Sequence, residues 1–184
     1  GLPIKGEGKP VIPQPGTNRW SGVALPWMAF GYGLSVTPLQ TLTLYNAVAN
    51  DGVMVKPIFV SEIKEWNKTI KKYNTEVINP KICSQETLDK VQAVLENVVK
   101  RGTGSKLYSK DFSMAGKTGT AQVNYKDKSK LYYASSFVGY FPADEPKYSC
   151  IIVVHKPNVA AGYYGADVAG PVFKRIAQKI FTDS

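Results

Sequence analysis

The sequence predicts an α+β fold in which helices pack on an antiparallel sheet. Helical patterns occupy the middle and the end of the chain, and three strand patterns rich in aromatic and β-branched residues fill most of the last third. Short turn sequences join these strands, which favours pairing between neighbours. With 184 residues, of which 43% are hydrophobic and 20% charged, the chain can bury a hydrophobic core.

Residues 1–36 are predicted to be irregular, because glycine and proline recur throughout them, with turns at Pro15-Gly16 and Gly31–Gly33. A helix is predicted next. Thr37 is its expected N-cap and Gln40, three residues later, completes a capping box. Apolar residues cover most of this helix, so we expect burial on several sides, up to an end at residues 50–52.

The middle of the chain is predicted to contain three extended segments, 53–60, 63–66 and 69–77. A turn at Asn67-Lys68 would join the last two as a hairpin. A second helix is predicted from Ser84, with apolar residues at helical spacing, and Gly102 is expected at its end.

The last third is predicted to form three strands and a helix, at 114–125, 132–141, 147–156 and 168–181. Residues 127–130 and 144–146 would provide the two turns, so that consecutive strands pair antiparallel. Phe173, Ala177 and their neighbours give the helix an apolar stripe that should lie on the sheet.

The charge is strongly basic, with 23 Lys plus Arg against 14 Asp plus Glu and a formal charge of +9. Such an excess favours polyanions. Much of it lies in residues 64–72 and 126–130, both between apolar segments, so we interpret these runs as solvated hairpin tips. No zinc-finger, homeodomain or RNP-like pattern is present, and we predict no nucleic-acid partner.

Metal and cofactor chemistry is not predicted. The two cysteines, Cys83 and Cys150, form no CxxC pair, and His155 is the only histidine. Cys150 lies in an apolar run and is expected to be a buried free thiol. No apolar run approaches the 18 residues of a membrane span and no leader is recognised, while a start at Gly1 without methionine suggests an excised piece.

The segment Lys117-Thr118-Gly119-Thr120 lies on a predicted strand and carries the clearest chemistry. A lysine ammonium supplies positive charge and a threonine hydroxyl supplies a directed hydrogen bond, which together suit a carboxylate. Gly119 would let another backbone approach, so that an extended peptide could add beside the strand. The Thr120 N–H could point at a developing oxyanion. This pattern favours acyl transfer on a peptide with a free carboxylate.

Five stretches together resemble the class B penicillin-binding proteins, in family order and across nearly the whole chain. They are GYGLSVTPLQ (31–40) with YNAVANDG (45–52), VVKRGTG (98–104), AGKTGTAQ (115–122), SFVGYFPA (136–143) and YGADVAGPVFK (164–174). The chain is similar to the carboxy-terminal part of a division-type transpeptidase domain. The resemblance implies part of the penicillin-binding-protein and β-lactamase-like fold, with residues 1–184 in a single domain.

The same resemblance implies peptidoglycan D,D-transpeptidase activity through an acyl-serine, on stem peptides that end in D-Ala-D-Ala, with β-lactams as inhibitors. It implies that Lys117 tunes the site and relays protons and that Thr118 and Thr120 bind the substrate carboxylate. Gly119, Ala121 and Gln122 would also belong to the substrate-binding site, where Gln122 would flank the acyl chain. Division or elongation proteins would be partners of an extracytoplasmic parent, anchored by one amino-terminal helix.

The nucleophile is the missing part. The family places its S-x-x-K and S-x-N motifs before Thr37, and no S-x-N occurs in the 184 residues. Ser61 and Lys64 fit S-x-x-K literally, but they follow a strand pattern rather than start a helix. Ser135 and Ser136 lie mid-strand, without the sharp turn that a serine hydrolase needs. We therefore predict that the chain alone is inactive.

Two other interpretations remain open beside the transpeptidase. One is a piece of a β-lactamase or D,D-carboxypeptidase, which uses the same K-T-G motif. The other is a non-catalytic module that binds cell-wall or division proteins. Tyr163, Tyr164 and Gly165 are expected to pack beneath the final helix rather than to bind a ligand, and His155 to lie at a strand end.

Overall fold

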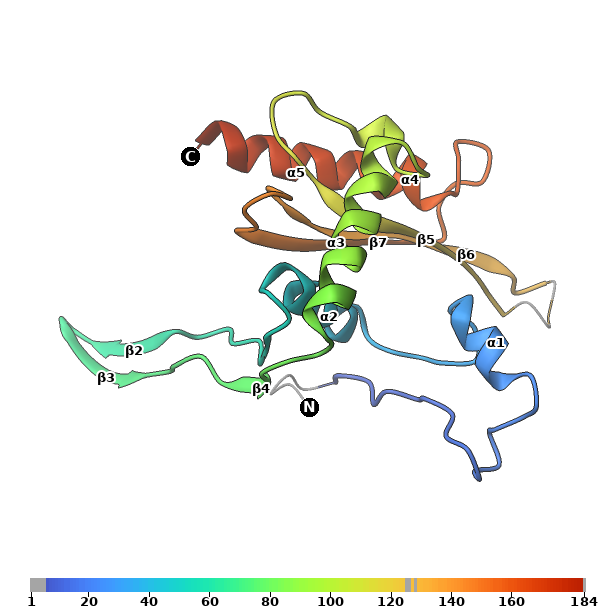
Figure 1. Cartoon of the computed structure of the whole chain (residues 1–184), viewed down its shortest axis with the longest axis horizontal. Helices are drawn as coiled ribbons and strands as arrows, with labels where there is room; N and C mark the ends of the chain where they lie inside the picture. The colour runs from blue at the N-terminus through green and yellow to red at the C-terminus, as the bar shows by residue number, and fades with distance from the viewer. Residues whose placement is uncertain (1–5, 125–126, 128, 184) are drawn as a thin grey trace. The chain divides into compact units, whose positions relative to one another are not determined.

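The computed structural model describes residues 6–124, 127 and 129–183. The chain forms two compact units, residues 1–41 and residues 42–184. We call them the amino-terminal unit and the sheet unit. Figure 1 shows their elements in chain order.

The amino-terminal unit is largely irregular, as predicted, and glycines with positive φ stand at the predicted turns (Gly16, Gly31 and Gly33). Val11 and Ser35 form an isolated antiparallel bridge, with N···O distances of 2.7 and 2.8 Å. The prediction misses one element, the six-residue helix α1 (Ala24–Ala29). Four of its six residues are good helix formers, and its single proline lies in the first turn, where it is tolerated.

Helix α2 (Pro38–Ala49) begins as predicted. The Thr37 N–H donates to Gln40 Oε1 at 2.9 Å, and the Gln40 N–H donates to Thr37 Oγ1 at 3.2 Å, which confirms the capping box. Residues 50–52 end the helix as predicted: Gly52 has a φ of +80°, and its N–H donates to the Ala47 carbonyl at 2.8 Å.

The burial of α2 is mostly partial, since ten of its twelve residues are buried or half-buried and only Pro38 and Leu44 are exposed. Only Ala47 and Val48 are buried, while the Leu44 side chain on the same helix is 48% exposed. Residues 45, 48 and 49 pack into a hydrophobic cluster of the sheet unit, while Ala47, which is fully buried, lies outside that cluster, so α2 is covered on more than one side as expected.

Residues 54–79 form a long irregular hairpin, which we call the arm. At its base β1 (Met54–Val55) pairs with β4 (Val77–Asn79), and farther out β2 (Glu62–Glu65) pairs with β3 (Lys68–Lys72), both antiparallel. The predicted hairpin is thus confirmed, but its strands are shorter than predicted and the turn lies one residue earlier. Strand pairing is interrupted because both ladders contain register shifts.

Helix α3 (Gln85–Lys100) has the predicted N-cap, since Ser84 Oγ accepts a hydrogen bond from the Thr87 N–H at 3.2 Å. It ends at Arg101, and the Gly102 N–H donates to the Val98 carbonyl at 3.2 Å. The short 3₁₀ helix η1 (Ser105–Leu107) follows.

The predicted three-stranded antiparallel sheet is confirmed. It consists of β5 (Ala115–Val123), β6 (Tyr132–Phe141) and β7 (Tyr148–His155), in the order β5-β6-β7. Strand β5 therefore lies at an edge, with its residue 117 opposite residue 138 of β6. Residue 125 of the first predicted strand and residue 128 of the predicted turn, together with residue 126 between them, lie outside the described residues.

The helix predicted at 168–181 corresponds to α5 (Gly170–Asp183), and a short helix that was not predicted, α4 (Gly165–Val168), precedes it. Gly170 lies against Leu107, where an added Cβ would lie 2.9 Å from two side-chain carbons. Helix α5 carries Phe173 and Ala177 on its buried side, as predicted.

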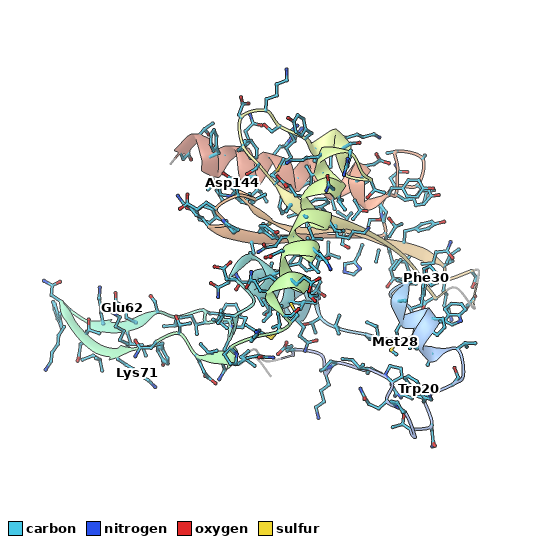
Figure 2. All side chains as sticks on the ribbon, in the orientation of Figure 1. Trp20, Met28, Phe30, Glu62, Lys71 and Asp144 are labelled. Atoms are coloured by element: carbon cyan, nitrogen blue, oxygen red, sulfur yellow. The ribbon has the colours of Figure 1, made fainter. Side chains whose placement is uncertain are left out.

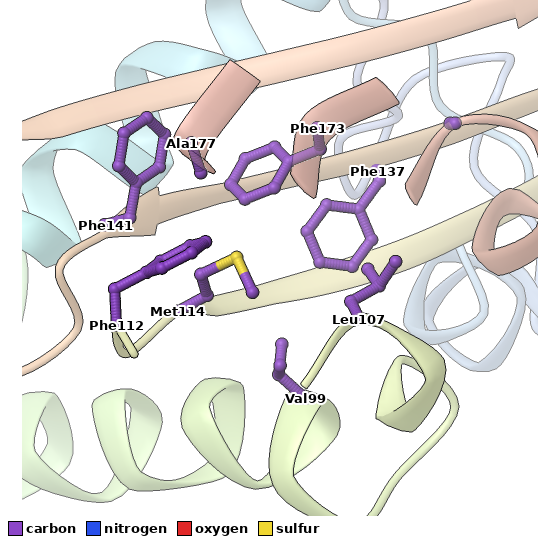
Figure 3. Close-up of a cluster of buried hydrophobic side chains, with 9 residues drawn as sticks. Val99, Leu107, Phe112, Met114, Phe137, Phe141, Phe173 and Ala177 are labelled. Carbon is purple, nitrogen blue, oxygen red and sulfur yellow. The ribbon is translucent and has the colours of Figure 1, made fainter. Parts of the chain in front are cut away.

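Two hydrophobic clusters cover opposite faces of the sheet. Figure 3 shows the first, where η1, α3 and α5 meet the sheet through Val99, Leu107, Phe112, Met114, Phe137, Phe141, Ala169, Phe173 and Ala177. The second packs α2 and α3 on the other face through Val48, Leu88, Leu95, Ala115 and Tyr140. Because side chains alternate along a strand, Phe137 and Tyr140 face opposite ways from β6. Burial, and then the charge of Glu96, raise the pKa of Tyr140 to about 12.

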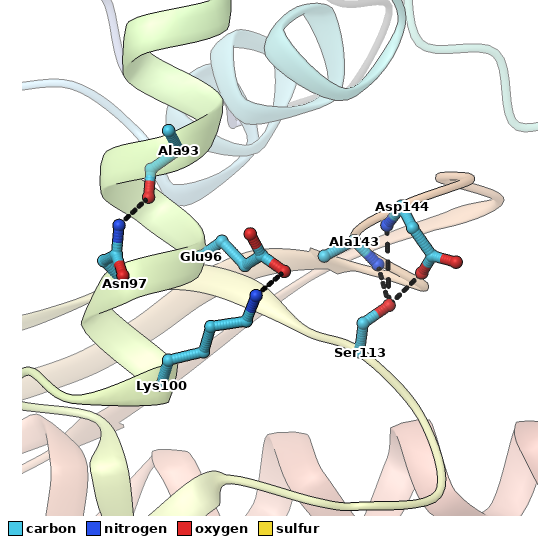
Figure 4. A network of polar contacts seen from close by, with 7 residues as sticks. All are labelled: Ala93, Glu96, Asn97, Lys100, Ser113, Ala143 and Asp144. Atoms are coloured by element: carbon cyan, nitrogen blue, oxygen red, sulfur yellow. Dashed lines mark hydrogen bonds and ion pairs between the residues drawn. The ribbon is translucent and has the colours of Figure 1, made fainter.

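A polar cluster holds the start of β5 to the β6–β7 turn (Figure 4). Ser113 Oγ donates to the Asp144 carboxylate and accepts from the Ala143 N–H at 2.8 Å and from the Asp144 N–H at 3.4 Å. The Ser113 hydroxyl, followed by the Asp144 N–H, holds the pKa of that carboxyl below its usual value.

Both cysteines are free thiols, and Cys150 is half-buried rather than fully buried as expected. Burial raises the pKa of its thiol. Among the described residues, no helix has the length and apolarity to cross a membrane, and no three His, Cys, Asp or Glu side chains gather as metal ligands.

Candidate active site

The predicted site residues lie on β5, along the open edge of the sheet. The Lys117 side chain is exposed, and its Nζ donates to the Thr118 carbonyl at 2.9 Å and to Thr118 Oγ1 at 3.2 Å. Of the carboxylates in the described part of the chain, none forms an ion pair with Lys117. An ammonium without a counter-ion therefore stands at the sheet edge, close to a threonine hydroxyl.

Thr118 is held from a second segment. Its Oγ1 lies 3.0 Å from Oγ1 of Thr103, which belongs to the Gly-Thr-Gly turn after α3. That turn is tight, because a Cβ on Gly102 would lie 2.8 Å from the Val98 Cα. The sequence analysis missed Thr103 as a site residue, although the glycines on both sides of it are a signal for a sharp turn.

The backbone that approaches Gly119 belongs to the chain itself. A Cβ on Gly165 would lie 2.6 Å from the Gly119 carbonyl oxygen and 2.3 Å from the Ser136 carbonyl oxygen, so only glycine fits there. From this position the Gly165 N–H donates to Thr120 Oγ1 at 3.1 Å. Since the Thr120 hydroxyl is the acceptor in this bond, its hydrogen remains available for a ligand.

An aromatic stack adjoins the far end of the site. Ala121 and Gln122 are exposed, and Gln122 Nε2 donates to Tyr133 Oη at 3.3 Å. Tyr133 stacks on Tyr163 with centroids 4.2 Å apart, and Tyr163 lies 4.4 Å from Tyr164. The expectation that the tyrosines pack beneath the final helix is therefore wrong, because stacking on Tyr133 places them beside β6. The hydrogen bond to Tyr164 raises the pKa of Tyr163 to about 12.

The structure also argues against the serines that the sequence analysis rejected as nucleophiles. Ser61 is exposed just before β2, and Lys64 Nζ is paired with Glu62 at 2.6 Å. Ser135 is fully buried, and its hydroxyl donates to the Tyr163 carbonyl. His155 ends β7, exposed and opposite Ala134, so its side chain lies on the other face from Ser135.

The Lys117 ammonium and the hydroxyls of Thr118 and Thr120 thus all lie on β5, a strand with an open edge. Such an arrangement can bind a peptide that lies extended beside the strand and ends in a carboxylate.

Comparison with known proteins shows to which family the chain belongs. A model of the penicillin binding protein transpeptidase domain matches residues 11–178. The chain belongs to this family. The resemblance to class B penicillin-binding proteins is confirmed, and so is the fold class.

Several curated relatives of this chain are about one-third identical to it. Peptidoglycan D,D-transpeptidase FtsI of Buchnera aphidicola is 33% identical over 168 residues, and covers 89% of the chain and 28% of its own length. Stage V sporulation protein D of Bacillus subtilis is 33% identical over 183 residues, with 96% and 27% covered. FtsI of Escherichia coli K12 is 30% identical over 177 residues, with 95% and 28% covered. The chain thus spans little more than a quarter of these relatives.

Two solved structures share the penicillin-binding fold. The transpeptidase domain of Burkholderia pseudomallei penicillin-binding protein 3 gives a TM-score of 0.70 at 28% identity, with 89% of this chain and 47% of that chain covered. PBPA from Mycobacterium tuberculosis gives 0.73 at 20% identity, with 85% and 37% covered, which supports the fold alone.

Proposed function

We propose that this chain supplies the substrate-binding wall of a peptidoglycan D,D-transpeptidase. The observation that carries the proposal is the Lys117–Thr120 segment on an open edge strand, with an unpaired ammonium and a hydroxyl hydrogen available. The names of the relatives support the reaction class, since two of those above are peptidoglycan D,D-transpeptidases.

In this proposal each residue of the strand has a role. Lys117 sets the electrostatic field and takes part in proton relay, while the hydroxyls of Thr118 and Thr120 bind the carboxylate of a stem peptide ending in D-Ala-D-Ala. The Thr120 N–H donates to the oxyanion. Gly119 and Ala121 are small and leave room for the substrate beside the strand, and Gln122 flanks the acyl chain.

The attacking serine would come from polypeptide outside these 184 residues. Its oxygen would attack the carbonyl of the penultimate D-alanine, the terminal D-alanine would leave, and an amine of another stem peptide would then displace the serine ester. β-Lactams would acylate the same serine. The chain alone is therefore proposed to be inactive, and a fluorescent penicillin should label the whole protein but not this chain.

We also propose that residues 1–184 are part of a single transpeptidase domain, which the continuous family match over 11–178 supports. The whole protein would act outside the cytoplasm, held at the membrane by an amino-terminal helix, together with division or elongation proteins. A whole protein that rapidly hydrolyses a chromogenic cephalosporin would instead favour a β-lactamase or carboxypeptidase.

The carboxylate site can be tested on the chain itself by NMR titration. N-acetyl-D-Ala-D-Ala should shift the backbone amides of residues 117–122, and its carboxy-terminal amide should not, because only the acid carries a charge for Lys117. Lys117→Met should abolish the difference, whereas Lys110→Met, which removes another exposed lysine, should preserve it. Equal shifts from acid and amide would contradict the proposal.

A further inference from the structure

The arm is an exposed protrusion of the sheet unit. Every residue of β2 and β3 is exposed, and Figure 1 shows the hairpin extending away from the three-stranded sheet. Figure 2 shows the labelled side chains of Glu62 and Lys71 on it, at a distance from the core elements. The proposed active site does not use this feature.

The outer part of the arm has two strands with two open edges. Strands β2 and β3 pair with each other and, among the described residues, with no other strand. A two-stranded ribbon without a covered face is marginally stable in water, and three strands are usually needed. An open edge is also a template for a further strand. The outer part of the arm could therefore be stabilised by a third strand.

Exposed apolar side chains accompany the open edges. Trp66 at the tip is 96% exposed, while Ile63 and Ile70 are 45% and 54% exposed. Tryptophan is enriched among the residues that dominate protein–protein binding energies. A tryptophan held in solvent at the end of a ribbon is thus suited to anchor a protein partner.

The net charge of the arm indicates the charge that a partner segment should carry. Residues 62–72 contain four lysines and two glutamates, which gives a net charge of +2. Lys64 is paired with Glu62, but of the ion pairs among described residues none involves Lys68, Lys71 or Lys72, all on β3. Three lysines that form no such ion pair therefore lie along β3; Lys68 and Lys72 are opposite Glu65 and Glu62 of β2, and Lys71 Nζ lies 4.7 Å from the centroid of the Tyr73 ring.

We propose that β3 of the arm binds an acidic, extended segment of a partner protein, which adds as a third strand along the lysine-bearing edge. Main-chain hydrogen bonds would provide the pairing, acidic side chains opposite Lys68, Lys71 and Lys72 would set the register, and Trp66 would cover one end. This inference does not depend on the proposed function.

Other occupants fit these observations less well. Two copies of the arm would set lysines against lysines across their β3 edges, which is unfavourable. A membrane surface would need one apolar face, but Lys72 is in register with Glu62 and Lys71 with Ile63, so lysines project from both faces of the ribbon.

The test uses the whole chain and a short synthetic peptide in which glutamate alternates with valine. Binding is measured by isothermal titration calorimetry, together with NMR shifts of the β3 amides. Lys68→Glu, Lys71→Glu and Lys72→Glu combined should weaken binding at least tenfold. The matched control combines Lys90→Glu, Lys110→Glu and Lys179→Glu, which changes the total charge equally at exposed sites outside the arm and should weaken binding less than threefold.

Two further comparisons test the strand geometry and the tip. Methylating alternate peptide nitrogens keeps the charge but removes the hydrogen-bond donors that face β3, and should abolish binding. Trp66→Ser should weaken binding at least threefold, and Phe30→Ser, which removes another aromatic ring exposed at 82%, should not. Circular dichroism melting of each variant confirms that the sheet unit remains folded.

Four results would overturn the proposal. They are no detectable binding of the acidic peptide, equal losses in the arm and control lysine variants, full binding of the methylated peptide, and displacement of the peptide by phosphatidylglycerol vesicles or duplex DNA at matched charge. The last result would assign the arm to an anionic lipid or a nucleic acid.

Discussion

Gly165→Ala tests how the close approach of α4 to the sheet supports the site. The new Cβ would lie 2.3 Å from the Ser136 carbonyl oxygen, while ordinary contacts begin at 3.4 Å, so the two segments must separate by about 1.1 Å. Both segments are backbone and cannot yield by rotating a side chain. Overpacking of this kind costs about 1–3 kcal/mol. Separation also takes the Gly165 N–H out of range of Thr120 Oγ1, which adds about 0.5–1.5 kcal/mol.

The total destabilisation of about 1.5–4.5 kcal/mol corresponds to a fall in melting temperature of roughly 3–18 °C for a chain of this size. Thermal unfolding followed by circular dichroism measures it. The control is Gly22→Ala, where a Cβ meets nothing within 4 Å and φ is not positive, and which should leave stability unchanged or raise it slightly. A melting temperature of the Gly165 variant within 1 °C of the unmodified chain would refute this reasoning.

Three further perturbations follow from contacts described above. Phe173→Ala should lower the free energy of unfolding by about 3–5 kcal/mol, because the ring is fully buried, and a urea titration showing a loss below 1 kcal/mol would contradict this. Ser113→Ala should raise the pKa of Asp144 toward its ordinary value of about 3.9, measured by carboxyl-carbon NMR. Because the pKa of Asp144 is lower in the folded chain, its ionised carboxylate stabilises the fold at pH values above the unfolded pKa. This stabilisation is lost as the pH falls through the folded pKa. The variant and the unmodified chain should therefore converge in stability in acid. Thr103→Val should weaken the binding of N-acetyl-D-Ala-D-Ala without lowering stability by more than about 1.5 kcal/mol, and unchanged binding would remove Thr103 from the site.

Local chemistry in the sequence predicts element starts and strand pairing well. The capping box of Thr37 and Gln40 and the N-cap Ser84 form as expected, since each requires only residues a turn apart. The β5-β6-β7 order follows because short turns force neighbouring strands to pair. The exposed Lys117 on β5 was also predicted from its strand pattern.

Long-range packing is what the sequence does not reveal. Apolar residues are distributed around much of α2, but how far each one is covered depends on the elements that pack on it, which no local pattern encodes. Thr103 reaches Thr118, and Gly165 reaches Thr120, over separations of 15 and 45 residues. Such contacts are fixed by tertiary structure, so these supporting residues could be found only from coordinates.

The position of β6 has a consequence for how the domain opens. This strand is paired on both edges, and the two hydrophobic clusters meet it from opposite sides through Phe137 and Tyr140. Its amide hydrogens should therefore exchange with solvent only when the whole sheet unit unfolds. Strand β5 pairs with β6 along nine residue pairs. We therefore expect β5, the candidate substrate-binding strand, to resist local unfolding as β6 does and to present a rigid surface to its ligand.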